Sequence, residues 1–194
     1  MLIIGPPGSG KGTQAERISQ LLGVVPISTG DIFRANVKGA TPLGLEAKKY
    51  IDAGDFVPDR VTNNMVREQL TEYDVENGFL LDGYPRTSGQ VDYLDNILAD
   101  LDRKLDVVLQ LAADDQELIR RLLGRAKDMG RSDDNEAVIR HRLGLYHEQT
   151  EAVVARYEAR NILAVVDGTG GVDEVTRRLV AAVSDVMAAT IPVS

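Results

Sequence analysis

Short runs of consecutive apolar residues recur along the chain, separated by longer segments of helical character. Because the runs are continuous rather than alternating, they are typical of parallel strands that are covered on both faces. The predicted strands are residues 2–4, 24–27, 79–81, 107–111 and 162–166, and the predicted helices are residues 12–22, 31–38, 42–52, 59–72, 88–102, 114–124, 133–159 and 171–189. Strand and helix in alternation predict an α/β fold, with helices on both faces of a five-stranded parallel sheet.

The alternation is interrupted at two places. Between the second and third predicted strands several helices intervene instead of one, and we interpret residues 28–57 as an inserted segment. The second place is residues 125–131, a short segment rich in charge that we interpret as a mobile loop. Since no linker, internal repeat or low-complexity tract occurs elsewhere, residues 1–194 are predicted to form a single domain.

Composition narrows the functions that the chain can have. Its 194 residues carry 30 acidic and 22 basic side chains, and the net charge of −8 disfavours a broad nucleic-acid surface. Cysteine is absent, which excludes disulfides, thiolate metal sites and cysteine nucleophiles. No apolar run approaches the roughly 20 residues that span a bilayer, and the first residues lack a signal-peptide pattern. We therefore expect a cytoplasmic protein without a membrane partner. Most of its basic residues are arginine, whose planar fork of donors suits phosphate when several converge in one cleft.

The sequence GPPGSGKGT at residues 5–13 is the strongest chemical signal, because it follows an apolar strand and opens a helix. Glycines at this spacing let backbone N–H groups point inward around a phosphate, and the helix N-terminus adds positive charge. Lys11 would add a charge at the β and γ phosphates, and Thr13 would supply a hydroxyl beside Mg²⁺. The chain departs from the general pattern at Gly12, which follows the lysine directly. The alternative, a glycine-rich turn that binds nothing, does not account for the whole match in this context.

A second signal is DGYPR at residues 82–86, which directly follows the third predicted strand. A carboxylate at the end of a strand beside a phosphate loop can hold hydrated Mg²⁺, and this is the role predicted for Asp82. Arg86 could clamp a second phosphate. The same residue types also suit a tight turn, and both interpretations can hold together.

Together with STGD at residues 28–31, these motifs resemble the adenylate kinase family, in the family's order and spacing from residue 2 to about residue 175. The resemblance implies a P-loop kinase fold with a nucleoside-monophosphate-binding insert at 28–57 and a short lid at 125–131. It also implies Mg²⁺-dependent transfer of the ATP γ-phosphoryl group to AMP, with ADP as the product, by a monomer. Because the chain has no cysteine, the zinc site of some relatives is not expected here.

The resemblance also assigns roles to individual residues. Those implied to hold ATP are Gly8, Ser9, Gly10, Lys11, Gly12, Thr13, Arg121, Arg125, Gly168 and Gly170. Those implied to line the AMP pocket are Thr29, Arg34, Asp55, Phe56, Val57, Gly83, Tyr84, Pro85, Arg86, Gln90, Arg131 and Arg142. Those implied to be catalytic are Lys11, Arg86, Arg125, Arg131, Asp133 and Arg142, with Asp82 on Mg²⁺ through water and Thr13 as a second candidate for the ion.

Several of these positions keep a structural alternative. Asp133 with Glu136 is typical of a capping box that starts the long helix, and it could equally be a partner in lid closure. If helical phase extended back to Arg131, the interval to Arg142 would make about three turns and place both on one side. The Gln90 amide can both donate to and accept from an adenine edge, although without the motif it would be interpreted as a solvated helix residue.

Other residues bear on the acceptor and on the chemistry. Thr29 favours AMP, since pyrimidine-specific relatives tend to carry a smaller residue there, and a kinase of UMP or CMP is the alternative. Asp55 stands where a basic residue is frequent in the family, where the contact is thought to be made by backbone. The arginine-rich second half of the chain disfavours a nucleotide switch, which would not need these arginines. The net charge disfavours a nucleic-acid-bound ATPase. Because an ionised AMP phosphate needs no general base, we predict that His141 and His147 are surface or packing residues.

Overall fold

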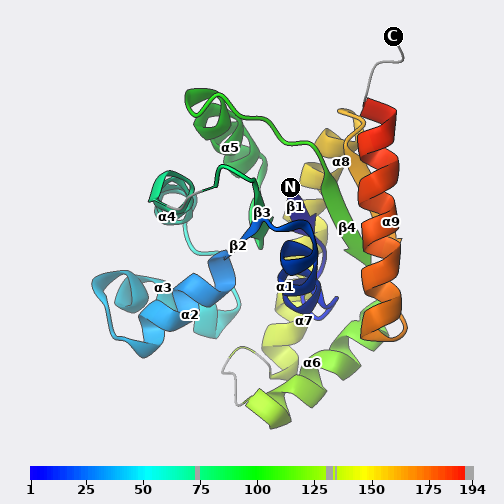
Figure 1. Cartoon of the computed structure of the whole chain (residues 1–194). Helices are drawn as coiled ribbons and strands as arrows, with labels where there is room; N and C mark the ends of the chain where they lie inside the picture. Colours follow the sequence, from blue (N-terminus) through cyan, green and yellow to red (C-terminus); the bar gives the residue numbers. More distant parts are fainter. Residues whose placement is uncertain (73–74, 130–132, 134, 191–194) are drawn as a thin grey trace.

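A computed structural model of the protein describes residues 1–72, 75–129, 133 and 135–190 (Figure 1). Within them, five parallel strands form one sheet in the order β2-β3-β1-β4-β5. The strands are β1 (Leu2–Ile4), β2 (Val25–Ser28), β3 (Phe79–Asp82), β4 (Val108–Ala112) and β5 (Leu163–Asp167). Leu2 of the central strand lies opposite Leu81 on one side and Val108 on the other. The predicted five-stranded parallel sheet is confirmed, and each strand lies within about one residue of its predicted position.

The described residues contain nine α-helices and one π-helix. They are α1 (Lys11–Leu22), α2 (Thr29–Lys38), α3 (Pro42–Ala53), α4 (Asp59–Glu72), α5 (Ser88–Asp100), α6 (Asp115–Met129), α7 (Glu136–Leu145), the π-helix η1 (Tyr146–Thr150), α8 (Glu151–Glu158) and α9 (Val172–Thr190). In the described part of the chain, no helix has both the length and the apolar character that crossing a membrane requires.

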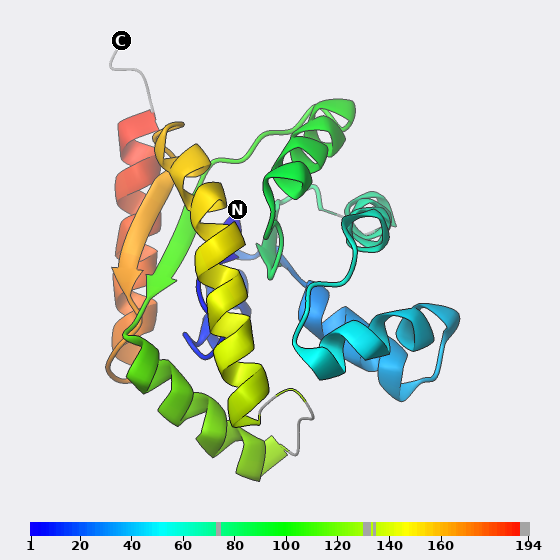
Figure 2. The ribbon, with the colours of Figure 1, turned by 180° about the vertical axis from the view of Figure 1, so that it is seen from behind.

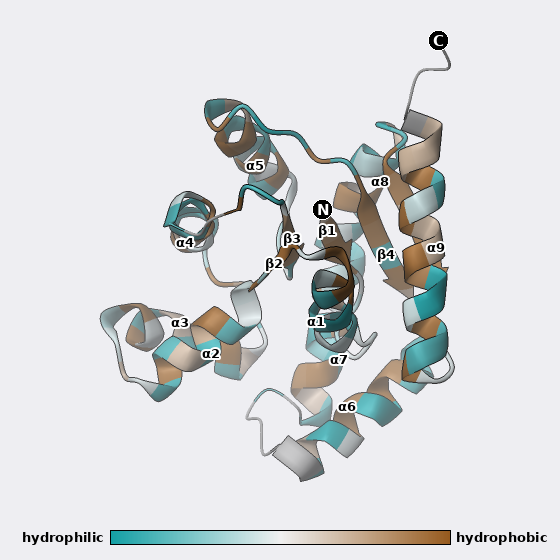
Figure 3. Ribbon diagram, viewed as in Figure 1, coloured by the Kyte–Doolittle hydropathy of each residue, from teal (hydrophilic) through white to brown (hydrophobic). Residues whose placement is uncertain are grey.

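Successive residues of a strand point to opposite faces of the sheet, and each face has its own core. Leu2 and Ile4 of β1 pack with side chains of α4, α5 and α8. Ile3 packs with side chains of α1 and α9. Figures 1 and 2, which show the molecule from opposite sides, place α1 and α9 on one face and α7 and α8 on the other. The central strands β1 and β4 are largely hydrophobic in Figure 3, since helices cover both of their faces.

Helices α2 and α3 form a hairpin that stands beside the sheet, next to the end of β2 (Figure 1). Thr41 caps α3, since its Oγ1 accepts a hydrogen bond of 3.1 Å from the Gly44 N–H. The two helices approach each other so closely at Gly44 that a Cβ there would lie 2.1 Å from the Asn36 carbonyl oxygen on α2. The segment 28–57 is therefore built around a contact that only glycine permits.

The predictions for two helices were wrong. The helix predicted to end at residue 124 continues to Met129, so residues 125–129 of the predicted loop are helical and residues 130–131 lie outside the described residues. Arginine, alanine, lysine and methionine are good helix formers, and a high density of charge does not end a helix. The long helix predicted for 133–159 begins only at Glu136, and the π-helix η1 interrupts it.

The start of α7 excludes one of the two interpretations of Asp133. Asn135 is the N-cap, because its Oδ1 accepts a 3.0 Å hydrogen bond from the Val138 N–H. The prediction that Asp133 and Glu136 form a capping box is therefore wrong. Helical phase also cannot be extended back from Arg142 to Arg131, since the helix does not reach that far.

Candidate active site

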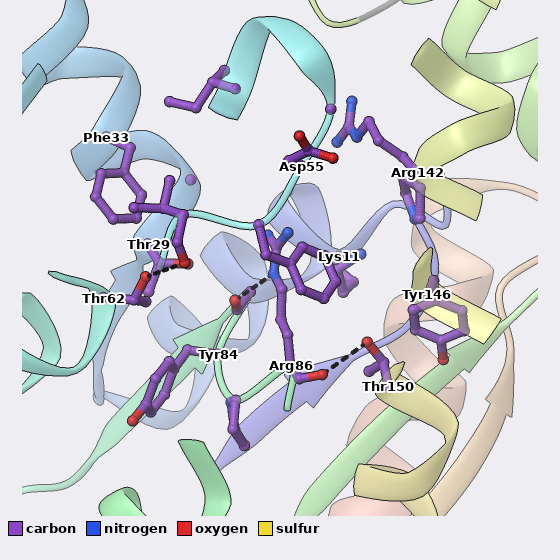
Figure 4. Close-up of a pocket in the computed structure, with 18 of the residues that line it drawn as sticks. Lys11, Thr29, Phe33, Asp55, Thr62, Tyr84, Arg86, Arg142, Tyr146 and Thr150 are labelled. Carbon is purple, nitrogen blue, oxygen red and sulfur yellow. Dashed lines mark hydrogen bonds between the residues drawn. The ribbon is translucent and has the colours of Figure 1, made fainter. Parts of the chain in front are cut away.

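The carboxyl ends of parallel strands meet at one edge of a sheet, and ligands of open α/β sheets bind there. At this edge the phosphate loop follows β1, Thr29 follows β2, the segment 83–86 follows β3, and the turn 168–170 follows β5. A cavity of about 130 Å³ lies at the same edge (Figure 4). The fold thus gathers sequence motifs that are far apart along the chain.

The loop between β1 and α1 takes the shape of a phosphate cradle. Gly8 and Gly10 have φ angles of +84° and +93°, which side chains disfavour, and Gly10 is the N-cap of α1. Lys11, the first residue of α1, turns its ammonium back into the loop. Its Nζ donates to the carbonyl oxygens of Gly5 at 2.7 Å and Pro6 at 2.9 Å. The lysine charge is therefore held at the centre of the loop, where a phosphate group would bind.

Charged groups from several elements surround the Lys11 ammonium. Its pKa is lowered from 10.5 to about 8, chiefly by burial, while the nearby Asp82 carboxylate opposes the change. Electrostatic repulsion from Arg86, Arg142 and Arg125 contributes to the lowering. These arginines come from the segment after β3, from α7 and from α6. Three of the predicted arginines are thus gathered around the lysine of the phosphate loop.

Asp82, at the end of β3, has the features expected of a residue that holds Mg²⁺. Burial raises the pKa of its carboxyl group, and the positive charges of Lys11 and Arg86 lower it. A Cβ on Gly12 would lie 3.7 Å from Asp82 Oδ2, so the carboxylate faces the start of α1. Thr13, the second candidate for the ion, is exposed on the first turn of that helix.

Mg²⁺ is usually bound by one or two carboxylates together with substrate phosphates. A site of this kind does not need a cluster of three histidine or carboxylate ligands, and the described residues contain no such cluster. The Asp82 carboxylate beside the phosphate loop therefore fits a magnesium ion that is carried with a nucleotide.

Most residues predicted for the AMP pocket line one cavity. They are Thr29, Arg34, Asp55, Phe56, Val57, Gly83, Tyr84, Pro85, Arg86, Gln90 and Arg142. Lys11 and Asp133 line the same cavity. Arg131 lies outside the described residues. The insert 28–57, the segment 83–86 and the phosphate loop therefore line one cavity.

Arg86 is fixed from three directions. Its Nε donates to the Gly83 carbonyl oxygen at 2.7 Å, and its guanidinium lies 5.2 Å from the centre of the Phe56 ring. The Thr150 hydroxyl donates to its backbone oxygen at 3.2 Å (Figure 4). Burial lowers the pKa of the Arg86 guanidinium, while the Asp82 carboxylate opposes the change. A buried, held guanidinium suits a fixed anionic ligand better than a solvated surface position.

Arg142 and Asp133 form a largely buried ion pair. Arg142 Nη1 donates to Asp133 Oδ2 at 2.6 Å and to the Asp133 carbonyl oxygen at 3.2 Å. Their side chains are only 17% and 8% exposed. Asp133 is therefore the partner of an arginine and not a helix cap, and its role in lid closure stays a prediction.

Gln90 is buried rather than solvated, so the surface interpretation of this residue is wrong. It is 2% exposed, and both ends of its carboxamide are hydrogen-bonded. The neighbouring Tyr84 lines the cavity with its ring, but its hydroxyl points elsewhere and donates to Asn63 Oδ1 at 2.7 Å. Thr29 is also buried, and its hydroxyl donates to the Asp82 carbonyl oxygen at 3.3 Å.

The turn after β5 lies beside the phosphate loop, outside the cavity. A Cβ on Gly168 would lie 3.2 Å from the carbonyl oxygen of Ser9. Arg121 of α6 donates to the Gly168 carbonyl oxygen at 3.0 Å and to Glu117 at 2.7 Å. Among the described residues predicted to hold ATP, Lys11 is the member that lines the cavity, and the others lie around the phosphate loop, on α6 and at this turn.

Some cavity residues could not be found from the sequence. Phe33, Thr62, Tyr146 and Thr150 line the cavity. The first two lie inside predicted helices and belong to none of the motifs, and the last two lie in the π-helix, which has no sequence pattern of its own.

The histidines agree with the prediction that they are surface or packing residues. His141 is 47% exposed, and its Nε2 lies 2.7 Å from Asp55 Oδ1. His147 is 45% exposed and contacts Glu151 and Asp115. The hydrogen bond to Glu151 is the largest of the contributions that raise the pKa of His147.

A phosphate loop at a helix start, a converging set of arginines and an acceptor cavity at one sheet edge define a P-loop phosphotransferase. The adenylate kinase family model matches residues 3–162 of this chain. The chain is 76% identical to the adenylate kinase of Pseudarthrobacter chlorophenolicus, over 97% of this chain and 98% of that one. It is 72% identical to the adenylate kinase of Renibacterium salmoninarum over the same shares, and 60% identical to that of Micrococcus luteus over 98% and 93%. The chain therefore belongs to the adenylate kinase family, and its activity is that of a nucleoside monophosphate kinase of this kind.

Proposed function

We propose that the protein transfers the γ-phosphoryl group of ATP reversibly to AMP, with AMP in the 130 Å³ cavity and the ATP phosphates on the loop 5–13. The observation that carries this assignment is the position of Lys11. Its side chain belongs to the phosphate loop and also lines the cavity formed by the insert and the segment 83–86. The two nucleotides can therefore approach each other across a single cluster of positive charge.

Catalysis by this arrangement rests on position and charge. Phosphoryl transfer spreads negative charge over the equatorial oxygens of the transferred group, and fixed cations stabilise that charge. The fixed positive charges come from Lys11, Arg86, Arg125 and Arg142. Asp133 positions Arg142 through their ion pair. The AMP phosphate is already ionised, so the residues have no proton to remove. Arg131 keeps its proposed role on the family resemblance alone.

Asp82 would hold Mg²⁺ through water, with Thr13 as the second candidate. When bound, the ion neutralises charge on the β and γ phosphate oxygens of ATP. The chain's own contribution is a buried carboxylate, whose pKa is raised by burial while the charges of Lys11 and Arg86 partly oppose that rise. Zinc is not part of the proposal, because the chain offers no thiolate ligand.

The two bases have separate proposed sites. Gln90, Thr29, Arg34 and the segment 55–57 hold AMP, while Arg121 and the turn with Gly168 and Gly170 meet the base of ATP. The insert 28–57 and the segment 125–131, whose residues 125–129 end helix α6, close over the nucleotides, which excludes water from the reacting phosphates. The monomeric state is proposed on the family resemblance. The protein is proposed to be cytoplasmic, and its net charge of −8 supports action on small nucleotides rather than on nucleic acid or membranes.

An assay of ADP formation tests the proposal. ATP is supplied with AMP, CMP, UMP or GMP, and we expect the highest kcat/KM with AMP. A preference for UMP or CMP would overturn the acceptor assignment. Lys11→Ala should lower the rate by about a hundredfold or more, because it removes a transition-state charge. Lys104→Ala changes an exposed lysine outside the cavity and should leave both the rate and the circular dichroism spectrum unchanged.

A further inference from the structure

Asp59, the first residue of α4, joins that helix to the start of α5. Its Oδ1 accepts a 2.7 Å hydrogen bond from Gln90 Nε2, and its Oδ2 accepts a 2.8 Å hydrogen bond from the Thr87 hydroxyl. Thr87 in turn caps α5, since its Oγ1 accepts from the Gln90 N–H at 3.1 Å. Asp59 does not line the cavity, whereas Gln90 does. The Asp59 carboxylate therefore binds Gln90, which lines the cavity, without lining the cavity itself.

The other end of the Gln90 carboxamide has a partner of the opposite kind. The backbone N–H of Arg86 donates to Gln90 Oε1 at 2.7 Å. A carboxylate can only accept and a backbone N–H can only donate, so the chemistry of both partners demands the same placement of the amide oxygen and nitrogen.

Turning the amide over would set its oxygen against the Asp59 carboxylate and its nitrogen against the Arg86 N–H. Both hydrogen bonds would be lost, and two mismatched pairs would be created. Since Gln90 is 2% exposed, water has little room to compensate. The orientation of this carboxamide is therefore fixed from both ends.

A fixed carboxamide can distinguish one class of base from another. After the bonds to Asp59 and Arg86, its nitrogen keeps one N–H and its oxygen keeps one acceptor position. Adenine offers an amine donor beside a ring nitrogen that accepts. Hypoxanthine and guanine offer the reverse, a carbonyl acceptor beside a ring N–H. An amide that cannot turn over fits the first pattern and leaves two mismatched pairs with the second.

We propose that Asp59 is a specificity-determining positioning residue, which selects 6-amino over 6-oxo purine monophosphates by locking the orientation of the Gln90 carboxamide. The inference rests on the proposed function, in which Gln90 meets the base of the acceptor. Asp59 itself touches neither nucleotide. Its carboxylate acts only through the side chain that it orients.

The test is Asp59→Asn, assayed with AMP and with IMP, which differ in the donor and acceptor at this edge of the base. An asparagine can present either its amide oxygen or its amide NH₂ group to Gln90. The substitution therefore removes the constraint at one end of the Gln90 carboxamide, while the Arg86 N–H still constrains the other end. We expect the ratio of kcat/KM for AMP to that for IMP to fall by about tenfold. A purely structural role for Asp59 would lower both values in proportion. An unchanged ratio would therefore overturn the proposal.

The control is Asp92→Asn, the same chemical change on α5 at an exposed aspartate that pairs with Arg156. It should leave the AMP to IMP ratio unchanged. Adding Asp59→Asn to Gln90→Leu should also leave that ratio unchanged, because the group being oriented is absent. A further loss of selectivity in this double variant would mean that Asp59 acts by another route, which would contradict the proposal.

Two outcomes separate the inference from the function on which it rests. A wild-type enzyme that uses IMP as readily as AMP would overturn both the role of Gln90 and the lock. A selective wild-type enzyme whose selectivity survives Asp59→Asn would overturn the lock alone. If Asp59→Asn does not fold, Asp59→Glu and Asp59→Gln repeat the comparison with a longer side chain. The glutamate should keep more selectivity than the glutamine, and equal selectivity would contradict the proposal.

Discussion

Replacing Gly44 with alanine tests whether the hairpin of α2 and α3 shapes the acceptor cavity. A Cβ at this position would lie 2.1 Å from the Asn36 carbonyl oxygen, whereas ordinary contacts begin at 3.4 Å. The partner is backbone and cannot rotate away. Gly44→Ala must therefore move α3 away from α2 by about 1 Å.

The cost follows from the size of this overlap. Overpacking of a tight contact destabilises a protein by about 1–3 kcal/mol, and a clash with backbone falls at the upper end. Alanine regains up to about 1 kcal/mol through its helix propensity. The net loss of about 2 kcal/mol should lower the midpoint of thermal unfolding by roughly 4–8 °C in a chain of this size.

The same movement should act on one substrate more than on the other. The segment 55–57 follows α3 and lines the cavity, whereas the phosphate loop is attached to β1 and α1. The KM for AMP should rise while the KM for ATP changes little. Calorimetry and initial rates with each nucleotide varied in turn measure the two effects.

Gly144→Ala is the matched control. No atom lies within 4 Å of a Cβ built on this glycine of α7, so alanine should stabilise the protein by up to about 1 kcal/mol. The reasoning would be refuted if Gly44→Ala were as stable as the wild type, or if it raised the two KM values equally.

Two further substitutions examine the charges at the site. Arg86→Ala should weaken AMP binding by about tenfold or more, because a charge-assisted hydrogen bond is lost, and ATP binding much less; titration calorimetry with each nucleotide measures this, and equal losses would contradict the assignment. Lys11→Met tests the lowered pKa of Lys11. Folding disfavours the charged lysine, and this penalty on the free energy of unfolding is fully present below pH 8. It is relieved between pH 8 and 10.5, where the lysine of the folded protein loses its proton first. Relative to Lys11→Met, the wild type should therefore gain up to about 3 kcal/mol of unfolding free energy as the pH rises through this window, and thermal melts that show no change in the difference would contradict it.

The sheet could be predicted because its strands meet helices on both faces. Leu2, Ile3 and Leu81 are completely buried, so the apolar runs are unbroken in the sequence. The end of α6 was placed too early because charged residues were interpreted as a loop, although their types favour helix. The π-helix η1 depends on hydrogen bonds that skip one residue more than those of an α-helix, and no sequence pattern encodes them.

Part of the candidate site could also be predicted from the sequence, and part could not. The phosphate loop could be predicted because its conformation is local and its glycines are required by the backbone. The role of Asp133 could not, because Asn135 is an equally good N-cap two residues later, and only the fold shows which residue takes that position. The bond between Asp59 and Gln90 spans 31 residues and depends on how α4 packs against α5.

The end of α3 and the start of α7 press against each other at a single point. Gly54 has a φ of +80°, and a Cβ on it would lie 2.7 Å from Val138 Cγ1 and 2.9 Å from Arg142 Cγ. Beside it, Asp55 meets His141 across 86 residues of sequence. Positions 54, 138 and 142 therefore occupy one shared volume and cannot drift independently. A side chain at position 54 would be strained by the positive φ even if the facing helix gave up bulk, so the contact between the insert and α7 depends on glycine.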